Sequence, residues 1–98
     1  MTGSTRAEHD SFGAIDVPAD AYWGAQTQRS IANFPFPAHE RMPLGIVYGL
    51  THVKRAAART HKLSGALASD IADAIVVAAD RILTGEFDDQ FPLVIWQT

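Results

Sequence analysis

Four histidines, His9, His39, His52 and His61, carry the side chains best suited to proton transfer or metal binding near neutral pH. No two of them lie four residues apart, so no helix can present the paired ligands of a zinc site. A lone histidine can act as a general base, but the neighbouring sequence supplies no nucleophile with an orienting acid. We therefore expect surface or capping histidines and assign them no chemistry.

An acidic group near the end of an expected helix contains Asp80, Glu86, Asp88 and Asp89. A calcium loop needs ligands at alternating positions around a central glycine, and this group lacks that spacing. The sequence predicts a solvated turn here and no metal site.

A basic stripe is formed by Arg55, Arg59 and Lys62, which recur at i, i+4 and i+7. Such a stripe could hold a phosphate or a nucleic acid. On an acidic chain without interleaved aromatic residues, it is more often a solvated face or one side of an interface. The residues alone therefore indicate no catalytic, substrate-binding or metal site.

Composition narrows the class of protein. The 98 residues are 47% hydrophobic and 19% charged, with a net charge of −3 and no cysteine, which fits one small globular domain without disulfides or thiolate metal sites. The acidic balance gives no reason to expect a nucleic acid or an acidic membrane as partner. Since no signal peptide, transit peptide or membrane span is recognisable, we expect a cytoplasmic protein.

The first elements that could position these side chains are a hairpin and a helix. Ile15 and Val17 alternate with polar residues and Gly13 suits a tight turn, so residues 5–18 predict a small β-hairpin. Asp20 can cap a helix over residues 21–33, although Gly24 weakens its start. Three prolines then predict an extended, irregular segment over residues 34–43.

Two longer helices are expected next. Pro43 suits the first position of a helix whose apolar stripe contains Val47, Leu50, Val53 and Ala57, and which ends near Ser64 with Gly65 as a left-handed stop. Ser69 is the expected N-cap of a second helix, whose stripe contains Ile71, Ile75, Ala78 and Ile82 and which Gly85 closes. The short link predicts an antiparallel pair with alanine-rich contact faces.

A polar turn over residues 86–90 precedes an apolar segment that contains Phe91, Leu93, Val94, Ile95 and Trp96. Termini are usually polar and frayed, so this segment predicts that the natural chain continues beyond Thr98. Without a continuation we expect an exposed apolar patch and a tendency to associate.

Two stretches resemble the N-terminal domain of class II fumarases, in the fumarase/aspartase superfamily. They are residues 8–34, which contain Val17-Pro18-Ala19-Asp20 and Trp23-Gly24-Ala25-Gln26-Thr27, and residues 88–98, which contain Asp89-Gln90-Phe91-Pro92 and Ile95-Trp96-Gln97-Thr98. The resemblance extends from Arg6 to Thr98. It implies a mainly α fold, in which a short N-terminal β-hairpin is followed by about three helices, and makes residues 1–98 the family's N-terminal lyase domain.

The resemblance also implies reversible, cofactor-free hydration of fumarate to (S)-malate in the citric acid cycle, by a homotetramer. A glycine-rich substrate-binding loop is expected immediately after Thr98, which therefore only borders the site. We assign no catalytic, substrate-binding or metal residue and expect residues 1–98 alone to be inactive. Two alternatives remain: an enzyme similar to aspartate ammonia-lyase, whose family shares Val17-Pro18-Ala19-Asp20, and a non-catalytic helical interaction module.

Overall fold

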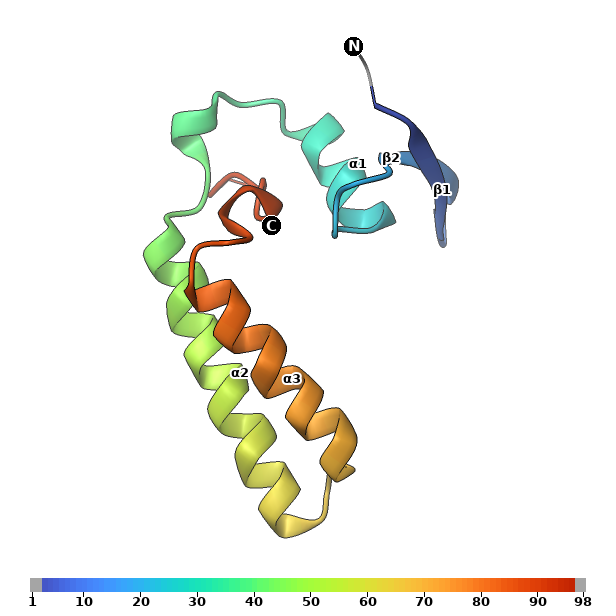
Figure 1. Ribbon diagram of the computed structural model, residues 1–98. Helices are drawn as coiled ribbons and strands as arrows, with labels where there is room; N and C mark the ends of the chain where they lie inside the picture. The colour runs from blue at the N-terminus through green and yellow to red at the C-terminus, as the bar shows by residue number, and fades with distance from the viewer. Residues whose placement is uncertain (1–2, 97–98) are drawn as a thin grey trace. The chain divides into compact units, whose positions relative to one another are not determined.

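The computed structural model describes residues 3–96, and the chain divides into two compact units. One unit contains the described residues up to Met42 together with those from Pro92 onward, and the other is Pro43–Phe91. Figure 1 shows the elements of both: a hairpin and a short helix in the first, and a pair of long helices in the second. No helix in the described part of the chain is long and apolar enough to cross a membrane.

The first unit begins with the predicted hairpin. Strand β1 (Thr5–Asp10) pairs antiparallel with β2 (Gly13–Pro18), in a register that places Arg6 opposite Val17. Gly13 takes the positive φ of 108° that the turn requires, and the Asp10 side chain accepts a 2.9 Å hydrogen bond from the Phe12 N–H. Val17 is fully buried, as expected for an apolar residue on one face of a half-buried strand.

Helix α1 (Ala25–Asn33) starts four residues later than predicted. Its N-cap is Gly24 in extended geometry, and Asp20 does not cap it. The reason lies in Arg6, whose guanidinium donates to the backbone carbonyls of Pro18, Ala19, Ala21 and Trp23 and so holds this stretch in a non-helical path.

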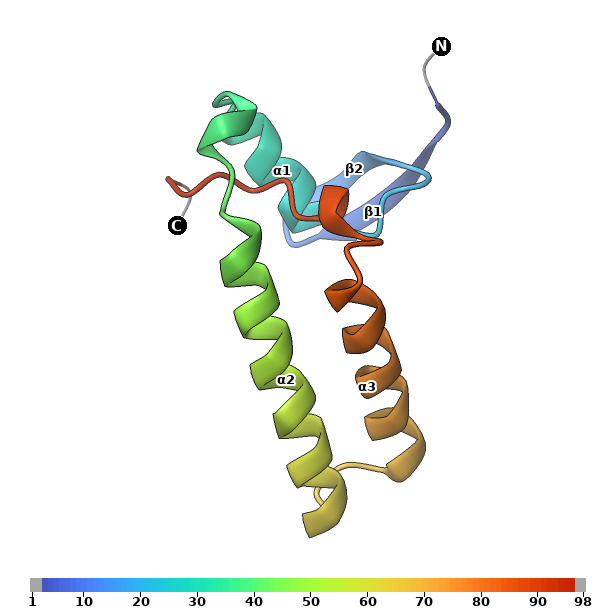
Figure 2. The same ribbon diagram turned by 60° about the vertical axis from the view of Figure 1, so that its left-hand side comes forward.

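The segment expected to be irregular contains a 3₁₀ helix, Ala38–Glu40. It is followed at once by a β-bridge between Arg41 and Val94, which pairs the end of this segment with the last described residues. Figure 2 shows the C-terminal segment, in red, crossing the green segment just before α2.

The second unit is the predicted antiparallel helical hairpin of α2 (Leu44–Ser64) and α3 (Ser69–Leu83), followed by a 3₁₀ helix at Asp88–Gln90. Gly65 ends α2 in the left-handed conformation, with a φ of 79°, as predicted. Gly85 likewise takes a positive φ beyond the end of α3. The N-caps, by contrast, are Pro43 and Ala68, so Ser69 is the first helical residue and supplies no cap.

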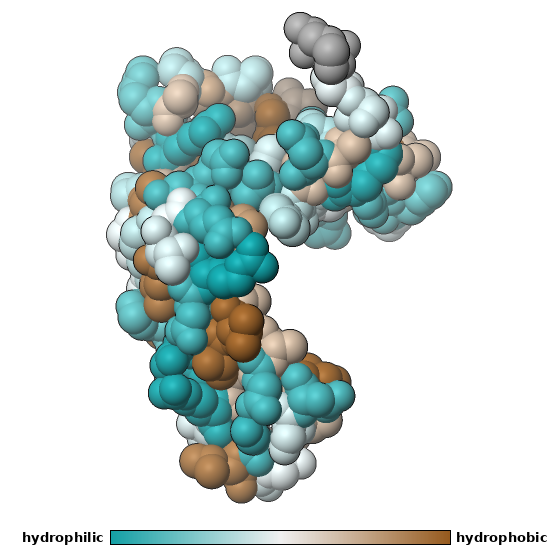
Figure 3. Space-filling model, in the orientation of Figure 1, coloured by the Kyte–Doolittle hydropathy of each residue, from teal (hydrophilic) through white to brown (hydrophobic). Residues whose placement is uncertain are grey.

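The contact between α2 and α3 uses smaller residues than the predicted stripes. Its buried positions are Val47, Thr51 and Ala58 on α2, and Ala72 and Ala79 on α3, so the expected alanine-rich contact is confirmed. The expected stripe of α2 is confirmed at Val47, which is buried. The stripes are wrong at Leu50, Val53, Ile71 and Ile75, which are exposed. Brown hydrophobic surface is accordingly visible along the helical hairpin in Figure 3.

Polar contacts also join the two helices of the hairpin. Arg55 donates to Asp80 and Lys62 to Asp73, both at 2.7 Å, across α2 and α3. Near the start of α2, the Tyr48 hydroxyl donates to the Asp88 carboxylate. This hydrogen bond to a carboxylate, with some burial, raises the pKa of the Tyr48 phenol.

Candidate functional site

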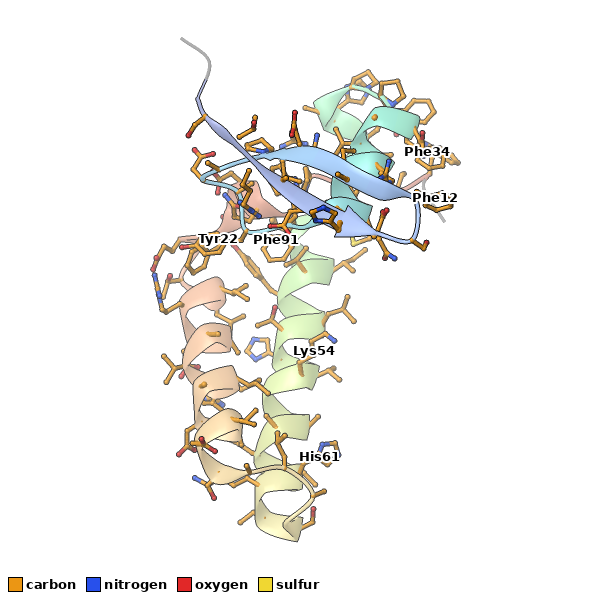
Figure 4. The ribbon with its side chains drawn as sticks, turned by 90° about the vertical axis from the view of Figure 1, so that its right-hand side faces the viewer. Phe12, Tyr22, Phe34, Lys54, His61 and Phe91 are labelled. Atoms are coloured by element: carbon orange, nitrogen blue, oxygen red, sulfur yellow. The ribbon has the colours of Figure 1, made fainter. Side chains whose placement is uncertain are left out.

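The described histidines are dispersed over exposed positions. His9 is on β1, His39 is in the 3₁₀ helix, and His52 and His61 are on α2. Figure 4 shows His61 near the end of α2 that leads to the loop, and Lys54 on the same helix. Within residues 3–96, no group of three or more histidines and carboxylates could hold a metal ion.

The acidic group separates into individual pairs. Asp80 pairs with Arg55, Asp88 accepts from Tyr48, and Glu86 pairs with Arg81. The hydrogen bond from Arg81 lowers the pKa of the Glu86 carboxyl, so this group is held in its ionised form. Two members of the basic stripe, Arg55 and Lys62, are also used between the helices, which favours the interface interpretation over a phosphate site.

A pocket of about 330 Å³ lies within the first unit. Its lining is mainly apolar and aromatic, with Trp23, Ile31, Phe34, Phe36, Leu93 and Val94 among the residues. The polar groups in this lining include Gln28, which accepts a 2.8 Å hydrogen bond from the Trp23 indole, and Arg41. None of the described lining residues is a histidine or a carboxylate, so the pocket can enclose an apolar group but offers no acid–base pair.

Arg41, Leu93 and Val94 of this lining belong to a set of contacts that we call the Glu40 clamp, in which residues 40–42 pair with residues 93–96. The Ile95 N–H donates to the Glu40 carbonyl at 2.9 Å, and the Met42 N–H donates to the Leu93 carbonyl at 3.0 Å. The Glu40 carboxylate also accepts a 2.9 Å hydrogen bond from the Trp96 indole. The contact between Glu40 and Trp96 joins residues 56 positions apart in the sequence.

The predicted apolar C-terminal segment is divided by this clamp. Val94 is buried, Leu93 is half-buried, and Ile95 and Trp96 expose 50% and 60% of their surface. The expected exposed patch is therefore confirmed at its last two described residues and wrong at Val94. Gln97 and Thr98, the expected border of the substrate-binding loop, lie outside the described residues.

Residues 13–98 match the profile of a protein family described as lyase. The chain belongs to this lyase family. It is 58% identical over 95 residues to a class II fumarate hydratase from Staphylococcus aureus, covering 97% of this chain and 20% of that protein. It is 55% identical over 94 residues to the class II fumarate hydratase of Pseudomonas putida, covering 96% of this chain and 20% of that protein.

A solved relative has the same fold. The crystal structure of a class II fumarase from Schistosoma mansoni superposes with a TM-score of 0.90 at 46% identity, covering 97% of this chain and 20% of that one. The resemblance to class II fumarases and the predicted order of a hairpin followed by three helices are both confirmed. The chain spans about a fifth of the length of the curated relatives it matches.

The sequence did not indicate the structural roles of three residues: Arg6, Arg29, which pairs with Asp10 at 2.7 Å, and Glu40. Arg6 and Glu40 bind backbone or indole groups of segments that are irregular in the sequence pattern, so no periodicity marks them. The nearest signal for Glu40 was its place between Pro37 and Pro43, because a proline-stiffened segment can hold a side chain in one direction.

Proposed function

We propose that this chain is the N-terminal part of a fumarate hydratase, which adds water reversibly to fumarate to give (S)-malate. The observation that carries the proposal is the 58% identity to a class II fumarate hydratase over 97% of the chain. Residues 1–98 are then the N-terminal lyase domain, a scaffold that leads to the site, and Thr98 borders the substrate-binding loop.

The finer parts of the proposal follow the same resemblance. The enzyme acts in the citric acid cycle, in the cytoplasm, as a homotetramer, with fumarate and malate as its small-molecule partners. The exposed Leu50, Val53, Ile71 and Ile75 support association, because exposed large apolar side chains favour burial against other protein surface. Size-exclusion chromatography with light scattering on the protein that contains this chain tests the tetramer; a monomer would contradict it.

The described residues support the expectation that residues 1–98 do no chemistry by themselves. Their histidines are scattered and exposed, and the described part of the pocket lining has no acid or base. Acid–base catalysis of hydration needs a positioned proton donor or acceptor beside preorganised hydrogen-bond donors. We expect those groups in the part of the relatives that this chain does not span.

The test is hydration of fumarate, followed by the loss of its ultraviolet absorbance. It is run on residues 1–98 and on the natural-length protein that contains them. Turnover by the longer protein and none by residues 1–98 supports the proposal. Turnover by residues 1–98 alone contradicts the expectation of inactivity, and release of ammonia from aspartate in place of hydration favours the ammonia-lyase alternative. A natural-length protein with neither activity points to the interaction module.

A further inference from the structure

In the Glu40 clamp, Glu40 accepts two hydrogen bonds from the last described residues of the chain. Glu40 accepts from the Ile95 N–H through its backbone carbonyl and from the Trp96 indole through its carboxylate, both at 2.9 Å. Because the two acceptors bind successive residues, they fix the position of the backbone at Ile95 and the orientation of the ring at Trp96. A backbone bond alone would leave that ring free to rotate.

Glu40 is itself held in place. It is the last residue of the 3₁₀ helix Ala38–Glu40, where its N–H donates to the Pro37 carbonyl at 2.9 Å and the Arg41 N–H donates to the Ala38 carbonyl at 3.1 Å. Proline fixes φ at positions 37 and 43 on either side, so little backbone freedom remains between them. A side chain on such a segment can act as a fixed reference for another part of the chain.

The burial pattern argues against simple core packing as the role of this contact. The Trp96 ring is 60% exposed and the Glu40 side chain 30% exposed, so the bond buries little apolar area. An ionised carboxylate is nevertheless a strong and directional acceptor, and an indole N–H is a donor only. The second carboxylate oxygen lies 3.7 Å from Nε2 of the exposed His39, beyond a direct hydrogen bond.

We propose that Glu40 is a positioning residue, which sets the course of residues 93–96 and thereby of the chain that follows them. This inference rests on the proposed function, in which Thr98 borders the substrate-binding loop. Only Gln97 separates Trp96 from Thr98 in the sequence, so a shift of the clamp is transmitted to that border over a very short length of chain. Displacement of a binding segment by about 1 Å can cost up to about a hundredfold in rate.

The experiment uses the natural-length protein that contains this chain. Glu40→Ala removes the carboxylate, Glu40→Gln keeps an acceptor oxygen without the charge, and Trp96→Phe removes the donor but keeps a ring. Glu86→Ala is the matched control, because Glu86 also pairs through its carboxylate, but with Arg81 five residues away and outside the clamp.

We expect Glu40→Ala and Trp96→Phe each to lower kcat/KM for fumarate by about tenfold, mainly through a higher KM, as expected for a weakened binding segment. The double variant loses no more than either single variant, because both remove the same contact. The kcat/KM of Glu40→Gln should lie between those of the wild type and Glu40→Ala, and the kcat/KM of Glu86→Ala should equal that of the wild type. A wild-type protein that hydrates fumarate, with clamp variants no different from Glu86→Ala, overturns the inference.

A second measurement does not depend on activity, and it distinguishes a failure of the clamp inference from a failure of the proposed function. Amide hydrogen exchange at Ile95 and Met42 reports the clamp directly, and we expect it to be at least about tenfold faster in Glu40→Ala than in Glu86→Ala. Unchanged exchange overturns the clamp even where activity falls. A wild-type protein without hydratase activity overturns the proposed function and the catalytic consequence, whereas faster exchange at Ile95 in Glu40→Ala still supports the clamp itself.

Discussion

The Arg29 guanidinium lies 2.7 Å, Nε to Oδ2, from the Asp10 carboxylate and so joins α1 to the turn of the hairpin. The same guanidinium donates to the Gly13 carbonyl at 3.1 Å, and its carbon lies 5.8 Å from the centroid of the Phe12 ring. The Asp10 side chain is only 7% exposed. Because Asp10 also accepts from the Phe12 N–H, one ion pair holds both the turn and the helix that packs on it.

The Asp10–Arg29 pair predicts a loss of stability in acid. The hydrogen bond from Arg29 holds the pKa of the Asp10 carboxyl below its ordinary value of 3.8. A carboxyl whose pKa is lower in the folded state stabilises the fold above its unfolded pKa, and this is lost as the pH falls through the folded pKa. We expect the free energy of unfolding of the wild type to fall below about pH 4, and more steeply than that of Asp10→Asn, when urea denaturation is measured along a pH series.

Arg29→Gln tests the cause of that shift. Carbon-detected NMR titration should find the Asp10 pKa in this variant raised toward its ordinary value, since the charged donor is gone. Arg41→Gln is the control, because it changes the net charge equally and removes no hydrogen bond to Asp10. An Asp10 pKa that responds equally to both substitutions would show a general charge effect and contradict the pair.

Arg6 is expected to be the most costly single polar side chain to remove from the first unit. It donates to the Glu8 carboxylate at 2.6 Å and to four backbone carbonyls between Pro18 and Trp23 at 2.7–3.1 Å. We expect Arg6→Ala to lower the free energy of unfolding by about 2–3 kcal/mol, the scale for charged hydrogen bonds, reduced because the side chain is about a third exposed. Arg6→Lys should keep only part of the lost free energy of unfolding, because an ammonium group lacks the five donors of the planar guanidinium. A loss under about 0.5 kcal/mol in Arg6→Ala, by urea denaturation, would contradict this.

How far the sequence could predict this structure depended on how local each determinant is. The hairpin followed from the alternation around Ile15 and Val17, and the end of α2 from Gly65, because these signals act within a few residues. The start of α1 could not be predicted in this way, because Arg6 of β1 holds the residues that precede the helix from a distant part of the sequence. The alanine-rich composition of the contact between α2 and α3 was predicted, but the helix faces that form it were not. The exposed leucine, valine and isoleucine side chains dominate the hydrophobic periodicity, whereas the buried Ala58 and Ala72 contribute little to it.

The candidate site was still less accessible to sequence reasoning. No role was assigned to the histidines or to the acidic and basic groups. Within residues 3–96, the structure gathers no three histidines or carboxylates that could hold a metal ion. The Glu40 clamp depends on pairing across 56 positions, and no local pattern reports such a contact. Resemblance to a family supplied the functional hypothesis, while the residues themselves supplied only the scaffold.

The close approach of α2 and α3 predicts that the same substitution at two nearby alanines of α3 changes stability by very different amounts. Ala72 is 1% exposed in the helix contact, whereas Ala74, two residues along the same helix, is exposed. Ala72→Leu should destabilise the protein by about 1–3 kcal/mol, because three added carbons must displace a packed partner. Ala74→Leu, the same substitution on the open face, should change the free energy of unfolding by less than about 0.5 kcal/mol. Equal effects in thermal or urea unfolding would show that the helices are not packed through Ala72.

Two glycines of the helical hairpin are expected to respond in opposite directions to the same substitution. Gly65 has a φ of 79°, where a Cβ is strained, so Gly65→Ala should cost about 1–2 kcal/mol although the space beside it is open. Gly49 lies inside α2 with nothing within 4 Å of an added Cβ, so Gly49→Ala should raise stability by up to about 1 kcal/mol through helix propensity. Urea denaturation of both variants against the wild type measures the pair. A neutral Gly65→Ala would mean that the chain leaves α2 without the left-handed turn, and a destabilising Gly49→Ala would mean that another surface packs against α2 at this point.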